Sequence, residues 1–201
     1  MNRKIIDFYL IVSNLKNVIR TGWEEVKIPK ENIESVMDHV GGTMLLAMAI
    51  NNEKNLDLDM NKVYTMILVK ELAKAYTNYE YSVLNPNLKE DYNRIIKDIF
   101  GNLSNGDYLF DIYNEYTLMN SKESKFVFKL SKLESDIQAK KYELDKLFTL
   151  DNAKEDIKNY PEDIKSTIKE ISKASEGWIK FDRKYYDDEL FNSLSKDIEE
   201  L

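Results

Sequence analysis

The sequence predicts an all-α protein, and three observations carry this prediction. Apolar residues recur at helical spacing along most of the 201 residues. Only 6 glycines and 3 prolines interrupt the chain, too few for a sandwich of many short strands. The share of hydrophobic residues is 43%, which is too high for a disordered chain and sufficient for a core. We therefore expect a compact bundle of about six to eight helices, built as a single domain over residues 1–201.

The first half of the chain predicts four helices. Apolar residues in segment 2–20 recur every three or four positions, which is typical of a helix with a wide buried face. Segment 33–51 predicts a second helix whose later half is apolar nearly all round and must be buried. Asp59 is a plausible N-cap for a third helix. The turn residues at 85–87 precede a fourth helix that ends near Phe100.

The second half predicts one short and one long helix before a polar end. Segment 107–118 predicts the short helix. Asn120, followed three residues later by Glu123, resembles a capping box and opens the longest periodic segment, 123–148. The helices expected in segment 151–201 are shorter and more polar, so this segment predicts a helical extension of the core.

The scarce residues exclude several kinds of site. The chain has no cysteine, which excludes disulfides, cysteine-zinc sites, iron–sulfur clusters and thiol nucleophiles. It has one histidine, His39, so no centre that needs two imidazoles from one chain is possible. A magnesium or calcium site made of carboxylates remains open.

The charge balance argues against nucleic acid as a partner. The chain carries 29 Lys+Arg against 36 Asp+Glu, a formal net charge of −7, and no dense basic stripe. From residue 151 onward there are 9 basic and 14 acidic side chains, so most of the excess negative charge lies in the extension. The first apolar run, residues 5–12, is too short to span a membrane, and it contains Asp7. We expect a soluble, cytoplasmic protein that binds neither nucleic acid nor membrane.

Three clusters have residues suited to a binding or catalytic site. The first runs over Leu15–Trp23 (LKNVIRTGW) and continues at Glu34–His39 (ESVMDH). The second is Ile67–Tyr76 (ILVKELAKAY). The third is Lys125–Glu143 (KFVFKLSKLESDIQAKKYE).

In this order and at these separations, the clusters resemble the HD-domain phosphohydrolase superfamily, and within it the 5′-deoxynucleotidase-like proteins. The resemblance covers about residues 5–145. It implies an HD-domain fold and a homodimer. The third cluster is the most specific, because seven of its residues fit the family pattern D-K-x-[ED]-x-x-x-Q-A-x-x-[YF]-E: Lys132, Leu133, Glu134, Gln138, Ala139, Tyr142 and Glu143.

The resemblance also implies where a metal would be bound. In the family, two imidazoles and two carboxylates converge on one divalent cation, which lowers the pKa of a bound water and neutralises a phosphate. His39 matches the first ligand, and Lys70 replaces the second histidine. Glu71 stands for the aspartate of the HD pair, and Ser131 for the final aspartate. Only His39 is unchanged, so the motif is degenerate.

Further positions are implied by the same resemblance. Lys74 lies where the family has a glutamate that helps to activate water, and Tyr79 lies where a later acidic residue is usual. Arg20 and Trp23 match positions that contact the nucleotide. A pocket for a phosphate would then be lined by Arg20, Trp23, Lys70 and Lys74.

The lysine at position 70 argues against a catalytic metal. An ammonium offers hydrogen-bond donors and no lone pair. At an effective dielectric of about 20, a unit positive charge repels a cation roughly 4 Å away by about 4 kcal/mol per charge. We therefore expect no bound metal and no cofactor.

Each of these residues also has a purely structural interpretation. A lone helical histidine is more often a hydrogen-bonded core residue than a ligand, and this holds for His39. Lys70 and Lys74 are four residues apart and would form a solvated face with Glu71. Arg20 and Trp23 would then be a helix end and an aromatic residue at the edge of the core.

Three functions are compatible with these residues. The leading hypothesis is a pseudoenzyme that keeps the helical fold and binds a small phosphorylated, nucleotide-like ligand or a protein partner. The alternative is an active phosphohydrolase on nucleoside monophosphates, with His39, Glu71, Glu34 and Asp38 around a rearranged site that holds Mg or Mn. A third possibility is a structural or regulatory adaptor with a filled pocket, whose contact surface is the acidic extension with Tyr185 and Tyr186.

Overall fold

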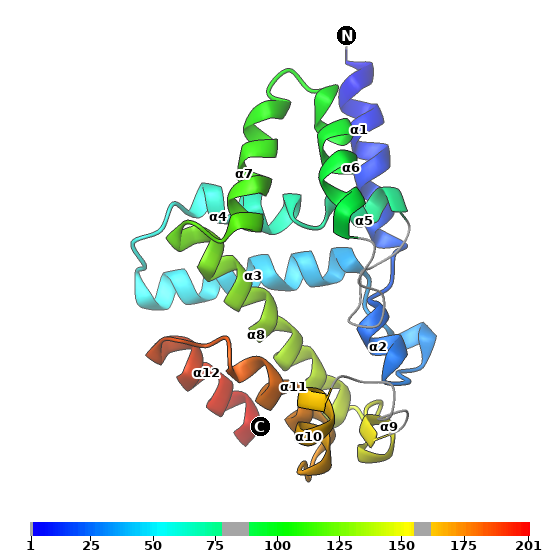
Figure 1. Cartoon of the computed structure of the whole chain (residues 1–201), viewed down its shortest axis with the longest axis vertical. Coiled ribbons are helices and arrows are strands. Elements are labelled where there is room, and N and C mark those ends of the chain that lie inside the picture. The colour runs from blue at the N-terminus through cyan, green and yellow to red at the C-terminus, as the bar shows by residue number, and fades with distance from the viewer. Residues whose placement is uncertain (1, 78–88, 155–161) are drawn as a thin grey trace. The chain divides into compact units, whose positions relative to one another are not determined.

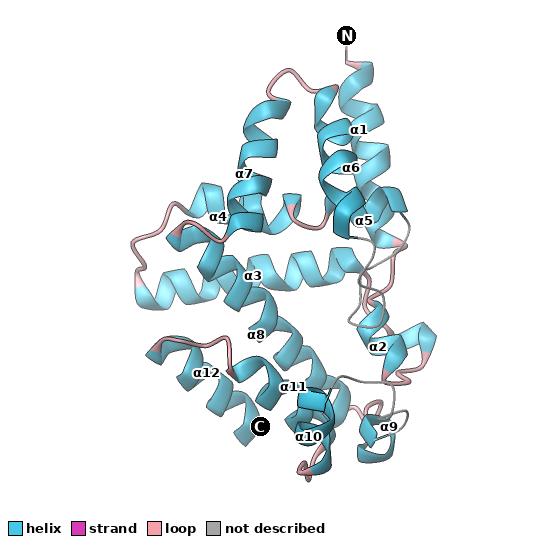
Figure 2. Cartoon of the chain, in the orientation of Figure 1, coloured by secondary structure: helices cyan, strands magenta, loops and turns pink. Residues whose placement is uncertain are grey.

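The computed structural model confirms the all-α class. It describes residues 2–77, 89–154 and 162–201. These residues form twelve α-helical segments, two short 3-10 helices and no strand (Figure 2). The expected number of six to eight helices is therefore too low, since nine of these α-helices have eight or more residues. Three more are only five or six residues long: α2 (Thr21–Glu25), α5 (Leu72–Thr77) and α9 (Leu150–Lys154).

The chain divides into two compact units. The first unit comprises residues 1–21 and 34–130, and the second comprises residues 22–33 and 131–201. The helix α8 (Lys122–Leu144) begins in the first unit and ends in the second. The division falls within the segment that the resemblance covers, and not at the start of the acidic extension near residue 151.

The first unit is a set of helices around a core of large apolar side chains. Helix α4 (Met60–Val69) packs against α3 (Val36–Lys54) and α7 (Gly106–Leu118), while α6 (Lys89–Gly101) packs against α5 and α7 (Figure 1). Met66 and Ile67 of α4, together with Ile96 and Phe100 of α6, are almost completely buried. The first unit also contains α1 (Arg3–Ser13).

The second unit contains shorter helices, as the sequence indicates. They are α10 (Glu162–Lys169), α11 (Ala174–Arg183) and α12 (Glu189–Glu200), with α2, α9 and the last part of α8. Asp188 caps α12, since its carboxylate accepts a hydrogen bond of 2.9 Å from the Phe191 N–H. Pro161, at the predicted start of a helix, lies outside the described residues.

Several predicted helix ends differ from the structure. The first helix ends at Ser13 instead of residue 20, because Val18 and Arg20 pair their backbones with the segment before α3. The capping box predicted at Asn120 is wrong. Ser121 caps α8 instead, since its hydroxyl accepts a hydrogen bond of 3.1 Å from the Ser124 N–H.

Two other features are as expected. Asp59 caps α4 by accepting a hydrogen bond of 3.2 Å from the Lys62 N–H, which confirms the predicted N-cap. No helix in the described ranges combines the length and apolar composition that crossing a membrane requires.

A capping box fixes the start of α3, the helix that carries His39. The Ser35 hydroxyl accepts a hydrogen bond of 3.1 Å from the Asp38 N–H, and the Asp38 carboxylate accepts one of 2.8 Å from the Ser35 N–H. Because these bonds satisfy two donors at the end of the helix, we expect Ser35→Ala to lower the free energy of unfolding by about 1 kcal/mol. Urea unfolding of this variant measures the change. Ser104→Ala, at an exposed turn position, is the matched control, and an equal effect of both variants would contradict the prediction.

Candidate functional site

The candidate site in the first unit is built at the start of α3. Segments 18–20 and 34–36 form a short antiparallel pairing, with hydrogen bonds from the Arg20 N–H to the Glu34 carbonyl (3.1 Å) and from the Val36 N–H to the Val18 carbonyl (2.7 Å). This pairing brings Arg20 next to the residues that precede α3. His39 follows in the first turns of α3 and is 3% exposed.

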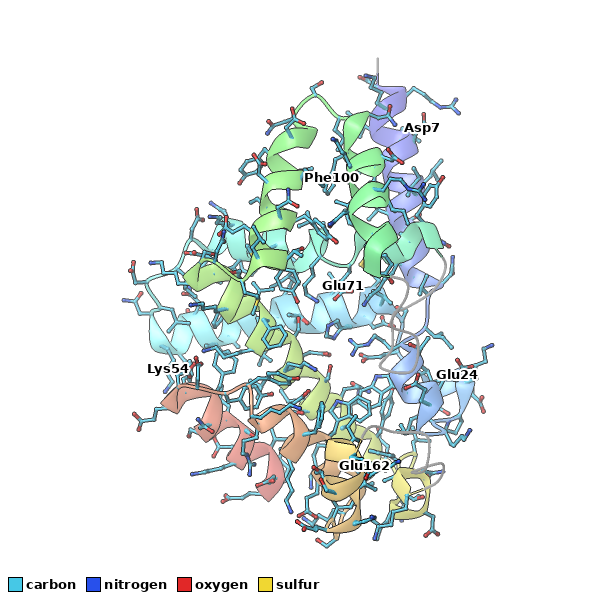
Figure 3. The ribbon with its side chains drawn as sticks, in the orientation of Figure 1. Asp7, Glu24, Lys54, Glu71, Phe100 and Glu162 are labelled. Atoms are coloured by element: carbon cyan, nitrogen blue, oxygen red, sulfur yellow. The ribbon has the colours of Figure 1, made fainter. Side chains whose placement is uncertain are left out.

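The junction between α4 and α5 supplies the charged residues. The Glu71 N–H donates to the Leu68 carbonyl three residues earlier (3.2 Å), which tightens the chain at this point. Val69 and Leu72 are buried on either side of Lys70 and Glu71, so these two charged residues also lie in the interior. In Figure 3, Glu71 lies between α3 and the ends of α6 and α7.

Glu71 forms the centre of a buried cluster of three charges. Its Oε1 pairs with the Lys70 ammonium, and its Oε2 pairs with the Lys74 ammonium. The side chains of Lys70, Glu71 and Lys74 are 4%, 6% and 13% exposed, which contradicts the interpretation of these lysines as a solvated face. The His39 Nε2 atom is 3.9 Å from Glu71 Oε1. We call Lys70, Glu71 and Lys74 the Lys–Glu–Lys cluster.

Burial and these charges shift the pKa values of the site. Burial lowers the pKa of His39 well below its usual value of 6.5, and Arg20 and Lys70 lower it further, so the imidazole is neutral at pH 7. Burial also lowers the pKa of Lys70. Burial alone would raise the pKa of Glu71, but Lys70 and Lys74 outweigh it and hold this pKa well below 4.5. Glu71 is therefore a carboxylate.

Two further carboxylates lie near the start of α3. One carboxylate oxygen of Glu34 is within 4.8 Å of a ring nitrogen of His39, so these two residues could share a ligand. Asp38 is occupied differently, because its Oδ2 accepts hydrogen bonds from both the N–H and the hydroxyl of Ser35. Of the alternative catalytic residues, Glu34 could therefore act together with His39, whereas the Asp38 carboxylate is used in the helix cap.

Two tyrosines of α7 also belong to the site, and the sequence analysis did not identify them. The Lys70 ammonium lies 5.9 Å from the centre of the Tyr116 ring, within reach of a cation–π interaction. Burial raises the pKa values of Tyr113 and Tyr116, and Glu71 raises both further. The only sequence signal was the apolar periodicity of segment 107–118, which does not distinguish a packed tyrosine from one that faces a charge.

Trp23 and Ser131 belong to the second unit. Trp23 is completely buried, with its ring stacked on Trp178 at 4.3 Å between centroids and the Tyr142 ring edge-on at 5.2 Å. These contacts favour the interpretation of Trp23 as a packing residue over a nucleotide contact. The Ser131 hydroxyl is buried and has no hydrogen-bond partner among the described residues. Tyr79 lies outside the described residues.

The charges around Glu71 disfavour a divalent metal at that carboxylate. Both carboxylate oxygens of Glu71 already pair with ammonium groups. Lys70 has no lone pair to offer in place of the imidazole that the resemblance implies there. In the described part of the first unit, Glu34 and His39 lie close together and could both contribute to a cation site.

Comparison with solved structures shows the fold. A conserved hypothetical protein from Pyrococcus furiosus superposes with a TM-score of 0.68 and 21% identity, covering 98% of this chain and 99% of that protein. A predicted metal-dependent phosphohydrolase from Magnetospirillum magnetotacticum superposes with a TM-score of 0.59 and 12% identity, covering 96% of each chain.

Comparison of sequences shows the family. The protein named 5′-deoxynucleotidase HDDC2 from Homo sapiens is 29% identical over 146 residues, which are 70% of this chain and 69% of the relative. The protein of the same name from Danio rerio is 30% identical over 146 residues, 69% of this chain and 70% of the relative. The HD domain family matches residues 12–174. The chain belongs to the HD-domain phosphohydrolase superfamily.

Proposed function

We propose that the chain binds a small phosphorylated, nucleotide-like ligand at the Lys–Glu–Lys cluster without a catalytic metal. The observation that carries this proposal is the pairing of both Glu71 oxygens with buried ammonium groups. An ammonium beside Glu71 supplies positive charge at the position where the resemblance implies a metal. The relatives named 5′-deoxynucleotidase support a nucleotide-like ligand.

The charge of the site supports an anionic ligand. The Lys–Glu–Lys cluster has two ammonium groups and one carboxylate, while the neighbouring His39 is neutral. Within the cluster, one positive charge exceeds the single negative charge of Glu71 and can attract a phosphate. An ammonium donates up to three hydrogen bonds, and Lys70 uses one of them for Glu71, so it has donors for a phosphate oxygen.

Thermal unfolding with deoxynucleoside monophosphates, in the presence of a chelator, tests this proposal. A ligand at about one hundred times its dissociation constant stabilises the folded chain by about 2.7 kcal/mol. Because a hydrogen bond to a charged group contributes about 1.5 to 3 kcal/mol, we expect Lys70→Met to weaken binding by about tenfold to a hundredfold.

The matched control is Lys97→Met, which removes an exposed lysine of α6. It is expected to bind like the wild type. An unchanged unfolding temperature with every nucleotide would contradict the proposal and favour the adaptor hypothesis. In that hypothesis Tyr186 cannot be the contact residue, because it is 4% exposed.

A second candidate function is supported by the proximity of Glu34 and His39. These residues are the start of a rearranged site for Mg or Mn, as an active phosphohydrolase would need. Metal analysis of the dialysed chain and a phosphate-release assay with Mg, Mn, Co, Ni and Zn distinguish the two candidates. Stoichiometric metal with turnover that Glu34→Gln abolishes would establish the phosphohydrolase and end the proposal of metal-independent binding.

A further inference from the structure

The second unit contains a buried pair of acids that the proposed function does not use. Asp136 lies on α8 and is 0% exposed, and Asp182 lies on α11 and is 2% exposed. Two ionised carboxylates in a water-poor interior repel each other, and each loses its hydration. Such a pair is stable only if cations or protons compensate its charge.

Only part of this compensation comes from hydrogen bonds. The Tyr186 hydroxyl donates a hydrogen bond of 2.6 Å to Asp136 Oδ2. The Lys132 ammonium lies 3.1 Å from Asp182 Oδ1. Asp136 Oδ1 is buried and has no hydrogen-bond partner among the described residues. An unpaired oxygen of an ionised carboxylate is costly in such a place, whereas a carboxylic acid can carry a proton there.

The balance of charged groups around Asp136 and Asp182 is consistent with one bound proton. Lys132 on α8 is positive, and Asp182 on α11 is negative. Arg183 on α11 also faces Asp136, but its guanidinium is 2.8 Å from the Glu199 carboxylate of α12. With both aspartates ionised, these named groups comprise two cations and three carboxylates. A single proton on Asp136 makes this set neutral.

The pKa shifts of Asp136 and Tyr186 agree with one bound proton. Burial raises the pKa of Asp136 well above 3.8, and Asp182 raises it further, although Tyr186, Lys132 and Arg183 act in the opposite direction. Burial also raises the pKa of Tyr186, so its hydroxyl remains a donor. Asp136 is therefore the natural site for the proton.

Tyr186 connects this acid pair to the C-terminal helices. It lies in the turn between α11 and α12, where its ring stacks on Phe191 at 5.8 Å between centroids. The Asn192 amide donates hydrogen bonds to the backbone carbonyls of Tyr186 (2.7 Å) and Asp188 (2.9 Å). These contacts hold the turn against the start of α12, and the hydrogen bond from Tyr186 to Asp136 links it to α8.

We propose that Asp136 holds a proton at neutral pH, and that this proton keeps the α11–α12 turn attached to α8. Loss of the proton at higher pH adds a negative charge at a completely buried residue and loosens the attachment. The contact is a pH-sensitive device in the second unit, separate from the Lys–Glu–Lys cluster of the first.

Urea unfolding of the full chain between about pH 5 and about pH 9 tests the proposal with Asp136→Asn. Asparagine resembles the protonated acid, since it accepts from Tyr186 and has a donor on its other atom. A raised pKa in the folded state gives stability that is complete below the unfolded pKa and is lost as pH rises toward the folded pKa. At pH values between the unfolded and the folded pKa, the unfolding constant of the wild type should rise by about tenfold per pH unit relative to the variant.

Asp145→Asn is the matched control, because it removes an exposed carboxylate just beyond α8. Its unfolding should follow the wild type at every pH. Parallel curves for the wild type and Asp136→Asn would show that Asp136 is already ionised and would overturn the proposal. If Asp136→Asn does not fold, infrared spectroscopy of the wild type decides: the carbonyl band of a buried carboxylic acid must be present at neutral pH and disappear on alkalinisation, and its absence overturns the proposal.

Discussion

Replacing Glu71 by alanine is expected to lower the free energy of unfolding by about 3 to 5 kcal/mol. The reason is that Lys70 and Lys74 would remain in the interior without the carboxylate that both of them contact. Burial already lowers the pKa of Lys70, and without Glu71 the ammonium must either lose its proton or draw water inward. Equilibrium urea unfolding at pH 7 measures the loss. Glu53→Ala, at an exposed position of α3, should change stability by less than about 0.5 kcal/mol.

Removal of the whole cluster should be far less damaging than removal of its centre. In the triple variant Lys70→Met, Glu71→Leu, Lys74→Met, no charge is left to desolvate, and apolar side chains of similar size fill the space. Buried ion pairs replaced in this way are often neutral or more stable. A triple variant as unstable as Glu71→Ala would show that packing around residue 71, and not charge, dominates.

The single variant Glu71→Ala also tests, through pH, whether Glu71 is the buried carboxylate. The depressed pKa of Glu71 means that its contribution is present above the unfolded value of 4.5 and is lost as pH falls through the folded pKa. The difference in stability between the wild type and Glu71→Ala should therefore shrink on acidification below about pH 4.5. A constant difference would contradict the assignment of Glu71 as the buried anion.

Replacing Trp23 by alanine is expected to lower the free energy of unfolding by about 3 to 5 kcal/mol as well. Trp23 is completely buried, and its deletion would leave Trp178 and Tyr142 facing a cavity. The stacked and edge-on contacts add about 0.5 to 1.5 kcal/mol per pair to the effect of burial. Thermal or urea unfolding measures the loss.

The matched control for Trp23 is Tyr108→Ala, which removes an aromatic side chain that is 49% exposed. It should have little effect. Trp23→Phe keeps an aromatic ring and should recover part of the stability. If Trp23→Ala is as stable as the wild type but no longer responds to nucleotides, Trp23 is a ligand contact and the packing interpretation is wrong.

Helical periodicity predicted the fold class well and the helix boundaries less well. The third helix was predicted correctly, because Asp59 has a side-chain capping signal that depends on a few adjacent residues. The end of the first helix was misplaced, because Val18 and Arg20 pair with residues 34–36. A contact between distant segments leaves no trace in the local apolar pattern.

The resemblance drew attention to four residues that the first unit brings together: His39, Lys70, Glu71 and Lys74. Their role as a ligand site stays a prediction. The resemblance did not indicate that one carboxylate would hold both lysines, since spacing fixes neither side-chain direction nor burial. The role of Ser131, the homodimer and the cytoplasmic location stay predictions.

The stacking of Trp23 has a consequence for synthesis on the ribosome. Residues 22–33 belong to the second unit, yet the rest of that unit begins at residue 131, about a hundred residues later in translation. Until Tyr142 and Trp178 have emerged, the indole of Trp23 has none of the rings that cover it in the finished protein. The nascent chain therefore carries an uncovered aromatic side chain for most of its elongation, and the second unit cannot complete its core until α11 has been made.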